Sequence, residues 1–158
     1  GANIIGSSLF ASQELLFNKQ IITPKFSYHP TPYPSLRPEV LGNNHIQRLF
    51  KDYNGQTYWL SISPASLMKS CALPKWLCFS FGYSIDKKIY GDANIATIQN
   101  NEYLSSKEYL FSLDIDFSKI KCKNNLLKII LNQLNYLKIP FSTISFSNNK
   151  LNFYPIYF

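Results

Sequence analysis

The sequence predicts a mainly β fold: an antiparallel meander or a small, partial barrel of about six to eight strands, with two or three short helices. Residues 77–86 and 109–117 each alternate between apolar and polar side chains, which is the period of a strand with two different faces. Clusters of Asn, Gly and Pro separate such stretches, as turns do. Hydrophobic residues make up 46% of the chain and charged residues only 16%, so a folded core is expected rather than disorder.

The 158 residues fit one β-rich domain, 1–158, because a single core usually serves roughly 100 to 200 residues. Residues 1–18 place apolar side chains at helical spacing, and the sequence opens on Gly1 rather than Met. We therefore expect this stretch to be the end of a helix that begins further upstream. Gly and Ser interrupt it, and it is too short for the roughly 20 apolar residues of a membrane-spanning helix.

The first half of the chain predicts two strands with a helix between them. Residues 20–29 alternate around Pro24 and predict an edge or early strand, and the four prolines within 30–38 predict a stiff, extended surface loop. Asn44 can cap a helix over residues 45–51, which Asn54-Gly55 ends. Residues 57–63 alternate again and predict the second strand.

The second half predicts four further strands. Pro64 is expected to begin a helix of one or two turns, ahead of the clear strand 77–86. Residues 87–107 combine Gly91 and Asp92 with three Asn and weak apolar content, and they predict a long loop or an irregular hairpin end before the strand 109–117. Asn124 can cap an amphipathic, basic helix near 125–137. The chain then ends in a hairpin over 141–158, with its turn at Asn148-Asn149.

Periodicity leaves two orientations of the strands open. In a soluble sandwich the aromatic face points inward, whereas in a membrane sheet it points toward lipid. The main strands have the length of a tilted spanning strand, which favours the membrane. The count of clear strands is below the eight of the smallest membrane barrels, which favours a sheet resting on the surface. Five aromatic residues are available for interfacial belts: Trp59, Trp76, Tyr83, Tyr109 and Tyr157.

The chain carries a formal net charge of +7, and its only arginines are Arg37 and Arg48. Because Arg rather than Lys suits base and phosphate recognition, specific nucleic-acid binding is not expected. A run of lysines without intervening acids can face anionic lipid head groups or can form a solvated basic face. We take Lys119, Lys121, Lys123 and Lys128 as candidate membrane-surface residues, and Lys138 continues the run.

Metal and cofactor sites have little support in the sequence. Cys71, Cys78 and Cys122 lack the spacing of a zinc site, and no disulfide framework follows from an odd number. Asp114 and Asp116 share one strand face and are weak candidates for a cation site. The pair is explained equally well if both acids simply face water or face lysines such as Lys119. We expect no cofactor.

Candidate catalytic and binding residues lie in the first half. Ser27 and His29 share a strand face and are weak candidates for a hydrolase nucleophile and base, although His29 can equally well end the strand. The segment 52–59 surrounds a Gly turn with acid, amide and aromatic groups, and this set of groups suits recognition of a sugar or peptide. The structural alternative is that Asn54-Gly55 forms the turn and that Tyr58 or Trp59 anchors the strand. The candidate binding residues are Asp52, Tyr53, Asn54, Gln56, Trp59 and Arg37.

The segment 51–61, KDYNGQTYWLS, resembles the YfiM-like family of uncharacterised bacterial envelope proteins, which are often described as predicted lipoproteins. Shorter matches follow at 74–77, 81–83, 112–116, 138–140 and 157–158, and upstream at 13–14 and 24–38. The resemblance implies an envelope address and a chain that is the C-terminal portion of a longer protein. It implies no reaction, since none is established for the family.

We expect a non-catalytic bacterial cell-envelope protein, integral to or peripheral on the outer membrane or its periplasmic face. Its expected partners are membrane lipid and other envelope subunits of a larger assembly. One alternative is an envelope lipid or cell-wall hydrolase that uses His29 with a nearby Ser. The other alternative is a soluble ligand-binding β-sandwich.

Overall fold

The computed structural model describes residues 8, 11–13, 15, 21–68, 72–90, 95–98 and 101–158. In these residues the fold is mainly β, as the sequence predicts, with eight strands in two antiparallel sheets. The described strands form an open sheet and do not close into a barrel. Of the helix expected over 1–18, residues 8, 11–13 and 15 are helical, and the rest lies outside the described residues, as does Cys71.

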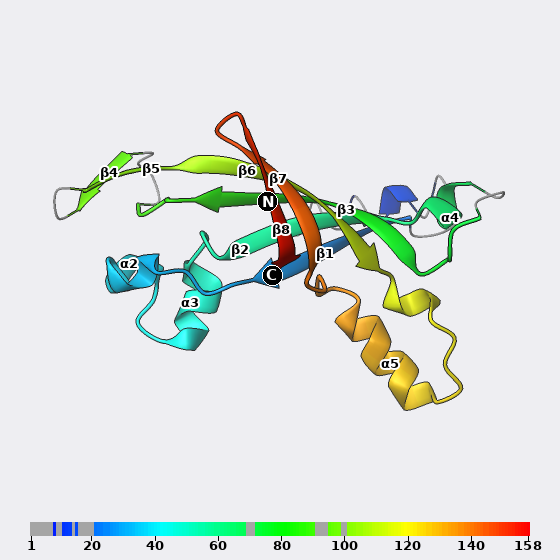
Figure 1. Ribbon diagram of the computed structural model, residues 1–158. Coiled ribbons are helices and arrows are strands. Elements are labelled where there is room, and N and C mark those ends of the chain that lie inside the picture. Colours follow the sequence, from blue (N-terminus) through cyan, green and yellow to red (C-terminus); the bar gives the residue numbers. More distant parts are fainter. Residues whose placement is uncertain are drawn as a thin grey trace.

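The larger sheet is a six-stranded antiparallel meander in the order β1-β2-β3-β6-β7-β8 (Figure 1). The long central strands, β3 and β6, pair over their whole length, from Leu77 opposite Ile115 to Asp86 opposite Ser106. The strands of this sheet are β1 (Ile22–Tyr28), β2 (Gln56–Ile62), β3 (Leu77–Asp86), β6 (Ser106–Ile115), β7 (Phe141–Ser147) and β8 (Lys150–Tyr157).

The second sheet is only the hairpin of β4 (Ile95–Ile98) and β5 (Asn101–Leu104). For the stretch 87–107 the sequence predicts either a long loop or an irregular hairpin end, and the hairpin is confirmed. In Figure 1 this hairpin extends beyond the ends of β3 and β6 and does not lie over the sheet. The described strands therefore do not build the two stacked layers of a sandwich.

The helices are short and lie at the ends of the strands (Figure 1). Two Asn caps act as expected: Asn44 accepts a hydrogen bond from the Gln47 N–H, and Asn124 accepts one from the Leu126 N–H. Besides the helical residues 8, 11–13 and 15, the described chain contains α2 (Pro38–Leu41), α3 (His45–Lys51), α4 (Pro64–Leu67) and α5 (Asn125–Leu134), with 3₁₀ turns η1 (Tyr33–Ser35) and η2 (Phe117–Lys119).

The proline-rich stretch 30–38 is not extended throughout, which corrects the expectation of a stiff extended loop. It contains the turn η1, and Pro38 is the first residue of α2. The reason is that proline also fits the first turn of a helix, where its missing N–H would have no partner anyway. Pro34 is buried, whereas Pro30, Pro32 and Ser35 are exposed, so the stretch lies at the surface with one proline packed inward.

The outer edge of β1 is covered by other parts of the chain. The Phe26 N–H donates to the Tyr136 carbonyl, and the Lys138 N–H donates to the Phe26 carbonyl, each at 2.9 Å. The side chain of Gln13 accepts from the Ile22 N–H at 2.5 Å and donates to the Ile22 carbonyl at 3.0 Å. Within the described residues, β8 is therefore the open edge of the sheet.

A small core lies on one face of the curved sheet, where Trp59, Leu110 and Tyr157 pack together. The Trp59 and Tyr157 rings meet edge to face with centroids 6.0 Å apart. Gly82 lies directly beneath the indole, and a Cβ at this position would come within 2.7 Å of the ring carbons. Trp59 and Tyr157 are only 2% and 9% exposed, so they are core residues and not members of an interfacial belt, which corrects that expectation.

Candidate functional site

The six-stranded sheet has an inner face of buried side chains and an outer face of exposed ones. On β3, Ser80 and Ser84 are buried, whereas the intervening Phe81 is 53% exposed. The pleat of a strand separates alternate side chains in this way, but soluble sheets normally bury the apolar side. Here the polar side is buried and the apolar side is exposed.

The strand register aligns the outer side chains into two continuous rows across five strands, which we call the outer rows. Contacts between rings cross the strands, with the centroids of Phe81 and Phe111 5.2 Å apart. Every member of both rows is exposed. The first row is Tyr58, Tyr83, Tyr109, Phe146 and Leu151, and the second is Leu60, Phe81, Phe111, Ile144 and Phe153. A continuous apolar surface of this kind marks a contact with lipid or protein.

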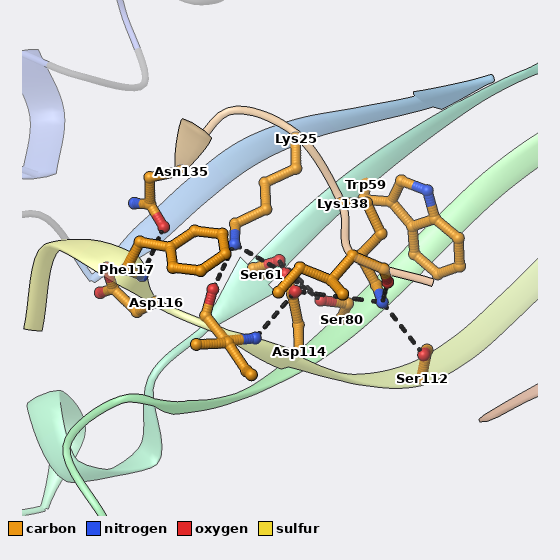
Figure 2. A network of polar contacts seen from close by, with 12 residues as sticks. Lys25, Trp59, Ser61, Ser80, Ser112, Asp114, Asp116, Phe117, Asn135 and Lys138 are labelled. Carbon is orange, nitrogen blue, oxygen red and sulfur yellow. Dashed lines mark hydrogen bonds and ion pairs between the residues drawn. The ribbon is translucent and has the colours of Figure 1, made fainter. Parts of the chain in front are cut away.

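The inner face contains a buried ion pair between two strands far apart in the sequence (Figure 2). The Lys25 ammonium, on β1, lies 2.9 Å from the Asp114 carboxylate, on β6, and both side chains are fully buried. The ammonium also donates to the Ile115 carbonyl at 2.7 Å. A charge buried at this depth is tolerated only when it is paired and hydrogen-bonded, and both conditions are met.

Hydroxyl groups of the two intervening strands complete the hydrogen bonding of Asp114. Ser61 on β2 donates to Asp114 Oδ2 at 2.6 Å, and Ser80 on β3 lies 3.2 Å from the same oxygen. The second carboxylate oxygen, Oδ1, accepts from the Ile115 N–H at 2.8 Å. Figure 2 shows these groups converging on Asp114 from neighbouring strands.

Lys138 enters the same region from the segment between α5 and β7. Its ammonium donates to the Leu113 and Ile139 carbonyls, at 2.9 and 2.8 Å, and to the Ser112 hydroxyl at 3.2 Å. It lies 4.0 Å from Asp114 Oδ1 and 5.1 Å from the centre of the Trp59 ring. Burial lowers the pKa of the Lys138 ammonium to about 8, against the opposing effect of Asp114. Lys138 is therefore not a surface cation, which corrects its place in the lysine run.

The two acids suggested as a weak cation site serve different partners. Asp114 pairs with Lys25, whereas Asp116 accepts hydrogen bonds from the Ser118 N–H and hydroxyl at the start of η2. The alternative to a cation site, an acid that faces a lysine, is correct for Asp114, but the lysine is Lys25 and not Lys119. The described residues contain no group of three or more His, Cys, Asp or Glu side chains that could hold a metal ion.

Ser27 and His29 lie where β1 approaches the core. The Ser27 hydroxyl accepts a hydrogen bond from the indole N–H of Trp59 at 2.9 Å. The His29 ring meets the Tyr157 ring at 5.8 Å, and its Nδ1 is buried without a hydrogen-bond partner in the described part of the chain. No hydrogen bond between Ser27 and His29 is present in that part, so the pair does not have the geometry of an activated nucleophile.

The turn of segment 52–59 is held together from within. Asp52 is fully buried and accepts from the Thr31 hydroxyl at 2.6 Å. The Asn54 amide exchanges two hydrogen bonds with the backbone of Lys88, at 2.7 and 2.8 Å. Gly55 lies so close to the His29 carbonyl that an added Cβ would come within 2.2 Å of its oxygen. These polar groups therefore maintain the fold, as in the structural alternative for this segment.

The remaining candidate binding residues do not gather into one site. Gln56 is buried and donates to the Leu49 carbonyl at 2.8 Å, and Trp59 is a core residue. Tyr53 is half-buried. The Arg37 guanidinium pairs with Glu39 and lies 4.4 Å from the centre of the Tyr90 ring.

The helix α5 contains no buried residue and projects away from the sheet (Figure 1). Leu126, Ile130 and Leu134 lie on one side at helical spacing and are 72%, 53% and 40% exposed. The candidate membrane-surface lysines are all exposed, three of them in the segment leading to the helix and one within it: Lys119, Lys121, Lys123 and Lys128. The helix and the segment before it thus present exposed apolar and basic groups together.

None of the described helices has the length and hydropathy needed to cross a membrane. Comparisons with protein families, curated proteins and solved structures find no match to this chain. The resemblance to the YfiM-like family therefore stays a prediction.

Sequence reasoning missed Lys25 and Lys138 as members of the inner network. A signal existed for Lys25, because it occupies the polar side of an alternating strand together with Ser27. For Lys138 no local signal exists, since its burial depends on the pairing of the segment after α5 with β1.

Proposed function

We propose that this chain is a non-catalytic protein of the bacterial cell envelope that holds its outer rows against lipid and acts as an accessory subunit of a membrane assembly. The observation that carries the proposal is the combination of an exposed apolar face with a buried, charged face on one sheet. In water this arrangement exposes apolar area at a cost of roughly 25 cal/mol per Å². In lipid the same area costs nothing.

The order of side chains along β3 supports a bilayer contact. Tyr83 belongs to the first outer row, Phe81 to the wholly apolar second row, and Trp76 precedes the strand and is 42% exposed. At roughly 3.4 Å per residue, Tyr83 and Trp76 are about 24 Å apart along the strand. With the roughly 35–45° tilt of strands in membrane sheets, this length covers roughly 18 Å of the roughly 25 Å apolar band that aromatic girdles flank.

The helix α5 supports the same proposal from a second element. A basic amphipathic helix lies in the interfacial plane, with its apolar side in the acyl region and its lysines near anionic head groups. Leu126 and Ile130 supply the apolar side, and Lys121 and Lys123 precede the helix. Its position at the Trp76 end of the sheet, close to η2, agrees with an interfacial depth.

The open edge of β8 supports the role of a subunit. Unpaired backbone groups are very costly in hydrocarbon, so a lipid-facing sheet needs its edges covered. The edge at β1 is covered by Tyr136, Lys138 and Gln13, whereas β8 has no neighbouring strand beyond β7 in the described residues. A strand from another envelope protein is the partner that this edge requires. The bacterial envelope address itself rests on the family resemblance.

The proposal is tested by fractionating membranes of cells that express the full chain and washing them at alkaline pH. We expect the wild type to remain with the membrane. The variant Phe111→Lys places a charge in the second outer row, which costs about 2–4 kcal/mol at mid-bilayer depth. We therefore expect it to be released. Thr97→Lys, in the exposed hairpin β4–β5, is the matched control and should be retained.

Two results together would contradict the proposal. One is complete release of the wild type by the wash, and the other is a monodisperse, detergent-free monomer that does not bind lipid vesicles. Release by the wash with retained binding to anionic vesicles would assign the chain to the membrane surface, within the same proposal.

A further inference from the structure

A polar cavity of about 540 Å³ opens on the inner face, at the end of the sheet away from the Lys25–Asp114 pair. Along β3 and β6 the order is the charged network, then the core around Trp59 and Tyr157, then the cavity. Its walls are the ends of β1, β3 and β6 and the hairpin of β7 and β8. Sites for small molecules commonly have volumes of roughly 300–1,000 Å³.

Two carboxylates in the cavity have unused hydrogen-bonding capacity. Asp86 accepts from the Tyr33 hydroxyl through Oδ1 at 2.7 Å, and within the described chain no bond engages its Oδ2. Among the described residues, Glu108 has only a long contact of 3.4 Å, between its Oε2 and the Tyr157 hydroxyl. His29 adds a buried, unpartnered Nδ1 to the same wall. Buried polar atoms are normally paired, so the His29 Nδ1 indicates a ligand or ordered water, and the half-buried Asp86 and Glu108 offer accessible carboxylate oxygens beside it.

The other lining groups point to the class of ligand. Lys150 and Asn152, on β8, supply donors to the lining, and Tyr154 on the same strand supplies an aromatic face. With two acids against one lysine, and His neutral, the formal charge of the lining is −1. A dianion is disfavoured by the carboxylates, and a diamine is disfavoured by Lys150. A neutral molecule whose hydroxyls each donate and accept fits a lining that offers both carboxylates and N–H donors.

We propose that this cavity binds a neutral saccharide of one or two rings. Sugar hydroxyls donate to the free oxygens of Asp86 and Glu108 and accept from the amide of Asn152, while the C–H face of the ring packs against Tyr154. The outer rows lie on the opposite face of the sheet, so this inference does not depend on a lipid contact.

The test uses the full chain in detergent and titrates it, by calorimetry and by saturation-transfer NMR, with a panel of monosaccharides and disaccharides. We expect at least one of them to bind with a dissociation constant below about 10 mM. Glu108→Gln should weaken that binding about tenfold or more, because it removes a charge-assisted acceptor. Asn152→Ala is the second variant, in case the first misfolds, and should also weaken binding.

The matched control is Glu102→Gln, on the exposed strand β5 and outside the cavity, which should bind as the wild type does. Ethanolamine, putrescine and phosphate are titrated in parallel. Absence of saccharide binding, binding that both cavity variants leave unchanged, or binding of an amine or phosphate alone would each overturn the proposal.

Discussion

At the scale of single residues, the inner face depends on one carboxylate that serves two ammonium groups. Asp114 lies between Lys25 and Lys138, and all three side chains are buried. Such a group adds little net stability compared with apolar residues of the same volume, since desolvation offsets the Coulomb attraction. Removal of one partner is costly, however, because the remaining charges stay buried. The network therefore specifies how β1, β6 and the segment after α5 come together.

The substitution Asp114→Asn should destabilise the fold by about 3–5 kcal/mol, because it leaves Lys25 and Lys138 buried without a counter-charge. Chemical unfolding in detergent, monitored by the fluorescence of Trp59 and Trp76, measures this loss. The same change two residues further on, Asp116→Asn, leaves an amide oxygen that can still cap η2 and should cost less than about 1 kcal/mol. Equal losses in the two variants would show that the buried pair has no special role.

The stability of the wild type should rise relative to Lys138→Met as the pH increases from about 8 toward the ordinary lysine pKa of 10.5. Burial lowers the pKa of Lys138 in the folded state, so in this window the unfolded chain binds a proton that the folded chain has lost. Thermal unfolding of both proteins at several pH values measures the difference. The raised pKa values of Cys78 and Tyr157 affect both proteins alike and cancel. A pH-independent difference would contradict a buried Lys138.

At the scale of elements, local sequence predicted most of the secondary structure. The strand 77–86 is confirmed at both ends, and Asn44 and Asn124 cap their helices as expected, because periodicity and capping act over a few residues. The sequence did not predict η1, because proline fits both an extended chain and a first helical turn. It also did not predict that the amphipathic helix ends at Leu134, which leaves the next residues to pair with β1.

The double variant Leu126→Ser, Ile130→Ser should weaken binding of the full chain to anionic lipid vesicles about a hundredfold. Burial of each side chain in the acyl region contributes about 1.5 kcal/mol or more, and both are exposed on α5. Vesicle co-sedimentation measures the change. The control is Asn132→Ser, on the polar side of the same helix, which should bind normally. Unchanged binding by the double variant would mean that α5 does not enter the membrane.

At the scale of the whole molecule, the alternation of residues predicted two chemically different faces but not which face lies inside. That choice depends on the curvature of the sheet and on long-range contacts, such as those of Trp59 with Tyr157 and Gly82. The aromatic content therefore gave an ambiguous signal: Trp59 and Tyr157 form the core, whereas Tyr83 and Tyr109 lie in an outer row. The polar cavity was not predictable either, because Asp86, Glu108 and Asn152 meet only in the folded sheet.

The most direct test of a lipid-facing sheet is the collision of spin labels with oxygen and with a water-soluble nickel complex. Labels are attached at Phe81→Cys and Phe111→Cys in the second outer row, and at Thr97→Cys in the hairpin, with Cys71, Cys78 and Cys122 replaced by Ser. In lipid bilayers, the two outer-row labels should collide with oxygen and be shielded from nickel, whereas the label at position 97 should collide with nickel. Free access of nickel to the labels at positions 81 and 111 in the bilayer sample would contradict the account.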